Sequence, residues 1–238
     1  MGLLQDALEV YGGIDRWHRL KRFTVHTSID GALLAQKGKG GLLKDIVAEG
    51  CTHTQSLRIT GFTAPHKCAV YRPDHVAIES LSGEILQACS SPRAAFLRHA
   101  NHTPWNDLHL AYFCGCLLWN HLTVPFLLAH PDVKTEELPS PCERAEIWRR
   151  LRAVFPTSIG TLSSEQIFYF DESGLQRRTD FCATDALDSP FADYVSAHQE
   201  FSGIVVPTLR RSLRLGPDGA VIAKPAYVDV EIFDASFA

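Results

Sequence analysis

Residues 108–129 read LHLAYFCGCLLWNHLTVPFLLA, the most apolar stretch of the chain. Its length approaches that of a membrane-spanning helix, but His109, Asn120, His121 and Pro125 interrupt it. Polar side chains and a proline at these positions favour a helix that is buried inside a folded protein and ends near the proline. We therefore expect a buried central helix and no membrane span.

The segments on both sides of this helix are typical of antiparallel strands. They are short, rich in Val, Ile, Thr, Tyr and Phe, and broken by frequent Gly and Pro residues. Alternating strands and helices of a parallel sheet would need longer crossovers than these breaks allow. Strands are expected at 23–29, 32–39, 42–49, 52–60, 67–71, 76–81, 85–88, 147–154, 165–170, 175–183, 194–202, 208–215 and 227–233.

A helix at 3–10 and a helical turn around Trp17 precede the strands, and a helical insert near 91–129 separates the two runs of strands. A large sheet has an inner face that must be covered, and only the insert is apolar enough to cover it. The sequence therefore predicts an α+β fold with one domain over residues 1–238. Its curved antiparallel sheet, a half-barrel of about 10–12 strands, is expected to wrap around the central helices.

Composition and charge make several classes of function unlikely for this protein. The 238 residues include 23 Lys and Arg against 27 Asp and Glu, so no excess of positive charge favours nucleic-acid binding. The seven cysteines are scattered and fit neither a disulfide framework nor a zinc ribbon. Asp6 and Glu9 stand where an export signal needs basic and then apolar residues. We therefore expect a soluble, cytoplasmic protein.

Two resemblances to known proteins add to this interpretation. The opening ALEVYGGIDRWHRL at 7–20, followed by strands, a helical insert and more strands, resembles lipoprotein-carrier-like (LolA-like) domains. That resemblance implies a half-barrel that holds lipid chains in a hydrophobic cavity. The whole length also resembles a group of uncharacterised bacterial proteins of similar size, through WNDLHLAYF at 105–113, EQIFYFD at 165–171, GLQRRTD at 174–180 and VPTLRR at 206–211.

The central helix carries two stripes of residues at three- and four-residue steps. One stripe is small and aliphatic: Leu108, Ala111, Gly115, Leu118 and Leu122. The other is aromatic, with a histidine and a thiol: Trp105, His109, Tyr112, Cys116, Trp119 and Thr123. Such a stripe is found in ligand pockets and also in plain protein cores. In the pocket interpretation, Trp105, Cys116 and Trp119 contact the ligand.

The same stripe offers acid/base chemistry. Imidazole titrates near neutral pH and a phenol can donate to a developing oxyanion, so His109 and Tyr112 form a natural proton-transfer pair. His102, Asp180 and His198 are further acid/base candidates.

Charged residues on the later strands allow two interpretations. Arg178 and Asp180 share one face of their strand, where they either pair structurally or face inward toward His198 as the polar end of a cavity. Phe168, on the preceding strand, is a candidate apolar contact. Arg210 is spaced with Arg214 either to bind a carboxylate or phosphate head group or to protect a solvated edge strand.

Residues 99–109 hold His99, His102, Asp107 and His109, which could supply metal ligands or an acid/base pair. Their spacing matches no known zinc signature, and the alternative is that His102 and Asp107 cap the long helix.

The sequence thus predicts a binding protein or a cofactor-free enzyme for a lipophilic or aromatic small molecule, held in an apolar cavity between sheet and helices. One alternative is an acid/base isomerase, cyclase or hydratase that uses His109 and Tyr112. A further alternative is a metal-dependent enzyme that uses the His99 to His109 cluster. No cofactor is expected, and the sequence leaves open whether two copies form a homodimer.

Overall fold

The computed structural model describes residues 2–97, 103–139, 142–143, 146–182 and 189–238. Fourteen strands form one open antiparallel sheet in the order β6-β5-β4-β3-β2-β1-β16-β14-β13-β12-β11-β10-β7, with β15 paired to β14. The strands are β1 (Arg22–Asp30), β2 (Leu43–Cys51), β3 (Leu57–Thr60), β4 (Lys67–Arg72), β5 (His75–Ser80), β6 (Ile85–Cys89), β7 (Lys134–Leu138), β10 (Arg149–Val154), β11 (Glu165–Phe170), β12 (Gln176–Cys182), β13 (Pro190–Phe201), β14 (Ile204–Leu215), β15 (Val221–Ile222) and β16 (Val228–Phe237). Strands β8 (Cys142–Glu143) and β9 (Glu146–Ile147) pair in a separate two-stranded sheet.

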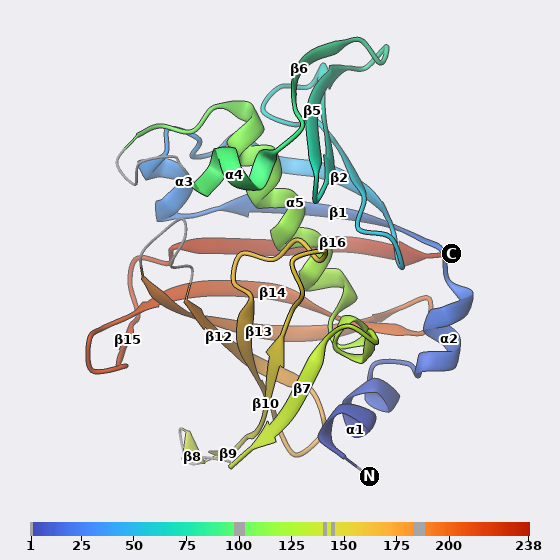
Figure 1. The fold of residues 1–238 in the computed structure, drawn as a ribbon, viewed down its shortest axis with the longest axis vertical. Coiled ribbons are helices and arrows are strands. Elements are labelled where there is room, and N and C mark those ends of the chain that lie inside the picture. Colours follow the sequence, from blue (N-terminus) through green and yellow to red (C-terminus); the bar gives the residue numbers. More distant parts are fainter. Residues whose placement is uncertain (1, 98–102, 140–141, 144–145, 183–188) are drawn as a thin grey trace.

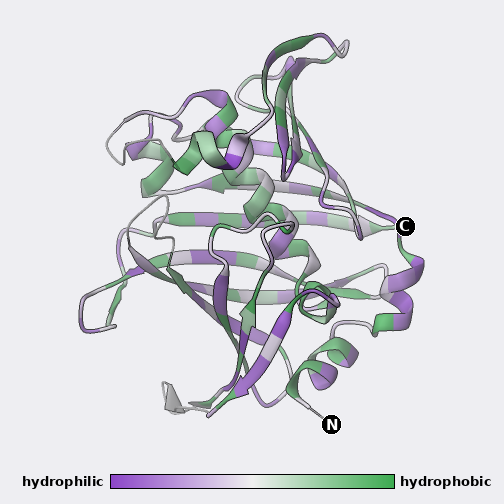
Figure 2. Ribbon diagram, viewed as in Figure 1, coloured by the Kyte–Doolittle hydropathy of each residue, from purple (hydrophilic) through white to green (hydrophobic). Residues whose placement is uncertain are grey.

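Alternation along the strands gives the sheet an apolar inner face. In β1, for example, Phe23, Val25, Thr27 and Ile29 are buried, while the residues between them are partly exposed. Figure 2 shows the same alternation of hydrophilic and hydrophobic residues along many strands. Because successive side chains of a strand point to opposite faces, this pattern fixes which face covers the core.

The helices are α1 (Leu3–Val10), α2 (Ile14–Arg19), α3 (Ala32–Gln36), α4 (Pro92–Leu97), α5 (Asp107–Thr123) and the short 3-10 helix η1 (Phe126–Ala129). Helix α5 runs across the middle of the sheet, and the strands at the two ends of the sheet cross the direction of the central ones (Figure 1). The sheet thus curls around α5, as the sequence predicted.

Helix α5 is buried on all sides from Leu110 to Thr123, with the exception of Asn120, so most residues of both stripes belong to the core. It packs against β4, β5 and α4. A Cβ atom at Gly115 would lie 2.1 Å from Cγ of Tyr71, so only glycine at this position allows the Tyr71 ring to approach the helix. The helix begins with a capping box, in which the side chain of Asn106 accepts from His109 N at 2.9 Å.

One detail of the sequence prediction was wrong. The segment 32–39 is not a strand, because Leu33 and Leu34 are buried on the helix α3. Gly31, with φ of 133°, directly precedes this helix, and a Cβ there would lie 2.5 Å from the carbonyl oxygen of Tyr227. Gly38 lies in the turn after α3.

The observed sheet of fourteen strands is close to the expected size of about 10–12 strands. Strand β7, with the sequence KTEEL, lies at an edge of the sheet, and its residues are largely exposed. A charged edge strand lacks the apolar alternation on which the sequence prediction depended.

Candidate functional site

A cavity lies between the C-terminal half of α5 and strands β11, β12 and β14. Its volume is about 40 Å³. Since a cavity needs about 10–15 Å³ to hold one water molecule, this space suits a small polar group. The apolar residues around it are Leu117, Val124, Leu162, Phe168 and Phe181, and the polar ones are Cys116, Asn120, His121, Gln166, Gln176, Thr179 and Arg210.

The charged group at the cavity is Arg210, and it is already paired. Its Nη2 donates to Oδ2 of Asp193, on the neighbouring strand β13. The side chains of Arg210 and Asp193 are 14% and 1% exposed. The pair is therefore buried, and its two charges balance each other.

Buried hydrogen-bonding capacity remains unused beside this pair. Oδ1 of Asn120, Nε of Arg210 and Oδ1 of Asp193 have no partner among the described residues. The amide nitrogen of Asn120 donates to the carbonyl oxygens of Cys116 at 2.7 Å and Gly160 at 3.0 Å, which leaves Oδ1 as an acceptor. Each buried polar atom without a partner costs about 1–3 kcal/mol. The cavity therefore offers a donor on Arg210 and an acceptor on Asn120.

His121 adds a neutral polar group to the same cavity. Its Nε2 lies 2.9 Å from the carbonyl oxygen of Pro207, and because a carbonyl only accepts, Nε2 carries the ring proton. Burial, together with the positive charge of Arg210, lowers the pKa of His121 to about 3. The ring is therefore uncharged at neutral pH and adds no charge to the cavity.

The structure brings three predicted ligand-binding residues to this cavity: Cys116, Phe168 and Arg210. The hydroxyl of Tyr71 lies 3.1 Å from Sγ of Cys116. Burial raises the pKa of Cys116 to about 11, so its sulfur is a neutral thiol.

The two predicted tryptophans lie elsewhere. Nε1 of Trp119 donates to the carbonyl oxygen of Cys51 at 2.9 Å, and its ring lines a different pocket, near α2. Trp105 packs against Phe96 and Phe113, with ring centroids 5.3 and 5.1 Å away.

Arg178 and Asp180 alternate with Thr179 and Phe181 and so lie on the outer face of β12, away from the cavity. Nε and Nη2 of Arg178 donate to the Asp180 carboxylate at 2.5 and 3.0 Å. The guanidinium carbon lies 5.1 Å from the ring centroid of Tyr169. The structural interpretation of this pair therefore agrees with the geometry better than a role in the cavity.

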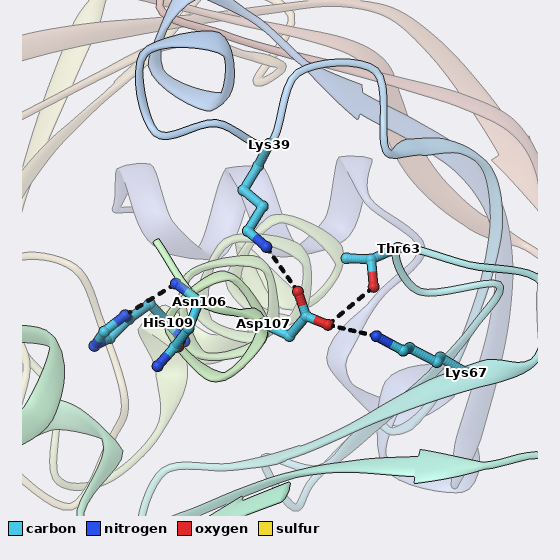
Figure 3. Close-up of polar contacts among 6 residues, drawn as sticks. All are labelled: Lys39, Thr63, Lys67, Asn106, Asp107 and His109. Atoms are coloured by element: carbon cyan, nitrogen blue, oxygen red, sulfur yellow. Dashed lines mark hydrogen bonds and ion pairs between the residues drawn. The ribbon is translucent and has the colours of Figure 1, made fainter. Parts of the chain in front are cut away.

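His109 and Asp107 extend from different sides of the start of α5 (Figure 3). Nδ1 of His109 accepts from Asn106 N at 3.4 Å as part of the capping box. Oδ1 and Oδ2 of Asp107 accept from Lys39 at 2.7 Å and from Lys67 at 2.9 Å. Burial alone would raise the pKa of Asp107, but the hydrogen bonds from the two lysines outweigh it and hold that pKa below its ordinary value.

The other predicted catalytic residues are also separate from the cavity. Tyr112 lies against Phe96 and Tyr71, and burial raises its pKa above the ordinary value. His198 lies edge-on to Tyr11, and burial with the charge of Arg177 lowers the pKa of His198 to about 4.

His99 and His102 lie outside the described residues. Within the described ranges, no group of His, Cys, Asp and Glu side chains is arranged to hold a metal ion. The catalytic and metal alternatives therefore stay predictions.

Sequence reasoning missed several cavity residues: Asn120, His121, Gln176, Thr179 and the nearby Asp193. Asn120 and His121 were noticed only as interruptions of an apolar helix. A lone aspartate in the apolar segment FADYV at 191–195 was a further sign. Buried polar residues need partners, so such interruptions indicate a polar site inside the core.

Within the part of the chain that the structure describes, no helix combines the length and the apolar character that a bilayer crossing requires. The sequence matches no protein-family model. It also matches no curated protein.

Three solved structures are similar to this chain over nearly its whole length. A LolA superfamily protein from Nitrosomonas europaea aligns with a TM-score of 0.53 at 8% identity, over 99% of this chain and 92% of its own. A domain from Vibrio parahaemolyticus named for outer membrane lipoprotein sorting aligns with a TM-score of 0.55 at 8% identity, over 99% and 90%. A DUF1329 family protein from Desulfovibrio piger aligns with a TM-score of 0.51 at 12% identity, over 99% and 91%. The chain therefore has a LolA-like fold.

Proposed function

We propose that the protein binds an apolar molecule with a small, uncharged polar head in the cavity between α5 and β11 to β14. The observation that carries this proposal is the unused donor of Arg210 and the unused acceptor of Asn120 at a cavity that five apolar side chains also line. The likeness to a protein named for lipoprotein sorting is consistent with an apolar ligand.

The charges around the cavity favour an uncharged head. Arg210 is already balanced by Asp193, and His121 is neutral. A carboxylate or an ammonium group would therefore enter a buried site with no opposite charge left to match it, which is costly. A carboxamide both accepts and donates, so it can accept from Nε of Arg210 and donate to Oδ1 of Asn120.

The size of the cavity limits what lies inside it. About 40 Å³ accommodates the head and the first carbon atoms of the ligand. The remaining alkyl chain would pass Leu162, a partly buried residue of the cavity lining. Side chains there must move to admit the chain, as side chains commonly do on binding.

Equilibrium dialysis with decanamide tests this proposal, with decanoate and decylamine as charged analogues of equal chain length. We expect decanamide to bind most tightly. Leu162→Trp, which places a larger side chain in the cavity, should weaken decanamide binding at least about tenfold, since overpacking leaves no room for the ligand.

The matched control is Leu81→Trp, a leucine that is 59% exposed and remote from the cavity lining, which should bind like the unaltered protein. Equal affinities of Leu162→Trp and Leu81→Trp for decanamide, or no binding by the unaltered protein, would overturn the proposal.

The cytoplasmic location stays a prediction. Fractionation of the native host into cytoplasm, periplasm and membranes, followed by immunodetection of the protein, tests it directly.

A further inference from the structure

A second, larger pocket lies at the opposite side of the end of α5. It is bounded by α2, by Thr52 and His53 after β2, by α5, and by η1 with the two residues that follow it. Its volume is about 250 Å³. A cavity of about 150 Å³ is enough to hold benzene, so this pocket has room for a molecule of one or two rings.

The base of this pocket is built from rigid aromatic rings. Trp17 stacks on Phe126 with ring centroids 4.3 Å apart and an angle of 4° between the planes. Trp119 is held by its hydrogen bond to the carbonyl oxygen of Cys51. All three side chains are nearly fully buried. Flat aromatic surfaces favour a flat ligand that can stack on them.

The hydroxyl groups in the pocket are already engaged. Thr52 donates to the carbonyl oxygen of Leu20 at 2.7 Å, and Thr123 donates to that of Trp119 at 2.8 Å. Polar recognition of a ligand must therefore come mainly from the rim.

Three exposed histidines form that rim: His18, His53 and His130. The ring of His53 lies 5.9 Å from that of Trp17 and 6.0 Å from that of His18, between centroids. Nδ1 of His130 accepts from the backbone N–H of Asp132 at 3.2 Å, so the neutral ring carries its proton on Nε2. Imidazole N–H groups donate hydrogen bonds to anions in both the neutral and the protonated state.

The charge around the rim also favours an anion. Among the described residues, none of those lining the pocket is a carboxylate. Oδ2 of Asp132 lies 4.0 Å from Nδ1 of His130, and the side chain of Asp132 is 67% exposed. Outside the pocket lining, helix α2 also carries one acidic residue, Asp15, and two arginines, Arg16 and Arg19.

We propose that this pocket, formed by Trp17, Trp119 and Phe126 with His18, His53 and His130 at its rim, binds a small planar aromatic carboxylate. The aromatic ring lies against the three buried rings, and the carboxylate accepts hydrogen bonds from the imidazoles. This site is separate from the cavity at Arg210, with which it shares none of its lining residues.

Titration of tryptophan fluorescence with naphthalene-2-carboxylate tests the proposal, with naphthalene-2-carboxamide as an uncharged analogue of the same shape. We expect the carboxylate to bind more tightly than the carboxamide. His53→Ala should weaken carboxylate binding about tenfold, because a hydrogen bond to a charged group is lost.

His66→Ala is the matched control, since His66 is an exposed histidine outside the pocket. It should leave naphthalene-2-carboxylate binding unchanged, and decanamide binding by His53→Ala should also be unchanged. Nuclear magnetic resonance locates the ligand independently, because a bound naphthalene ring shifts the imidazole signals of His18 and His53.

Equal binding of the carboxylate by the His53→Ala and His66→Ala variants would overturn the proposal. So would equal affinity for carboxylate and carboxamide, or ring shifts that avoid His18 and His53.

Discussion

The buried pair of Arg210 and Asp193 dominates the site at the scale of single residues. Because Asp193 is 1% exposed, removing its partner leaves a charge that water cannot reach. The pair also explains why the polar end of the cavity carries no net charge, which is the basis of the preference for an uncharged ligand head.

A double-mutant cycle measures this pair. Arg210→Met should lower the free energy of unfolding by about 3–5 kcal/mol, because it leaves Asp193 buried and unpaired. The double variant Arg210→Met with Asp193→Leu should regain most of that loss, since both charges are then absent. Urea unfolding gives the values, and a double variant as unstable as the sum of the two single variants would contradict a coupled pair.

His121 makes the free energy of unfolding depend on pH. Its folded pKa of about 3 lies below the ordinary value, so the unfolded chain binds a proton that the folded protein does not between about pH 6.5 and 3. Stability should therefore fall as the pH drops below about 6.5, by about 1.4 kcal/mol per pH unit from this residue. Above that range His121 should contribute no pH dependence.

The comparison of the unaltered protein with His121→Gln isolates this effect, because His198, whose pKa is also lowered, is present in both. Urea unfolding between pH 7.5 and 4.5 should show a shallower loss of stability in His121→Gln. Parallel curves would mean that His121 is not buried in its neutral form.

Among the elements, α5 is the one on which the core depends. It is buried on all sides from Leu110 to Thr123, with the exception of Asn120, packs against β4 and β5, and also borders the cavity next to β11, β12 and β14. A helix that is apolar all round belongs in a protein interior.

Truncation of a leucine in this helix tests its contribution. Leu118→Ala removes a side chain that is 0% exposed and should cost about 2–5 kcal/mol of unfolding free energy. The matched variant Leu86→Ala, at a leucine that is 45% exposed on β6, should change stability by less than about 0.5 kcal/mol. Similar losses in both variants would place α5 outside the core.

The two edge strands of the sheet differ in how well they are protected against pairing with other chains. Edge strand β7 carries Lys134, Glu136 and Glu137, whereas edge strand β6 has the uncharged sequence ILQAC with Ile85 62% exposed. Charges on an edge strand oppose pairing with other chains. Figure 2 shows β7 mainly in hydrophilic colours.

We therefore expect Ile85→Lys to reduce aggregation on heating, measured by light scattering, while Thr135→Lys on the charged edge should have little effect. An equal reduction by both substitutions would show that general charge, and not the β6 edge, controls association. The homodimer itself stays a prediction, which sedimentation of the unaltered protein would test.

The sequence predicted strands and helices with a clear hydrophobic pattern better than elements whose conformation depends on tertiary contacts. Strand β11 at Glu165–Phe170 agrees with its predicted range, and the buried central helix was recognised from its composition. The helix α3 was missed because its leucines fit either a strand or a short helix, and only contacts such as that of Gly31 with Tyr227 decide between them.

The site was harder to predict because it depends on strand faces. Cys116, Phe168 and Arg210 were chosen and line the cavity, but Arg178 and Asp180 lie on the outer face. A register shift of one residue moves a side chain from one face of a sheet to the other. Where charged and apolar residues alternate along a strand, the alternation alone does not show which face points inward.

At the scale of the whole molecule, one sheet contains strands from Arg22 to Phe237, and β1 near the start of the chain pairs with β16 near its end. Many of the contacts that hold the fold are therefore remote in sequence. A continuous sheet around one helix favours unfolding as a single unit.

That a single domain spans residues 1–238 stays a prediction. Urea unfolding followed by far-ultraviolet circular dichroism and by tryptophan fluorescence should give coincident transitions, because Trp17 contacts Phe126 and Trp148 contacts Tyr169 within one cooperative structure. Two separate transitions would show that the sheet divides into independently stable parts.

The cavity between α5 and the sheet is the central claim, and a crystal structure of the protein grown with decanamide tests it most directly. We expect electron density for the carboxamide head within hydrogen-bond distance of Nε of Arg210 and Oδ1 of Asn120, with the alkyl chain leading out past Leu162. Density for decanamide elsewhere on the protein, or ordered water alone between Arg210 and Asn120 at saturating decanamide, would contradict the account.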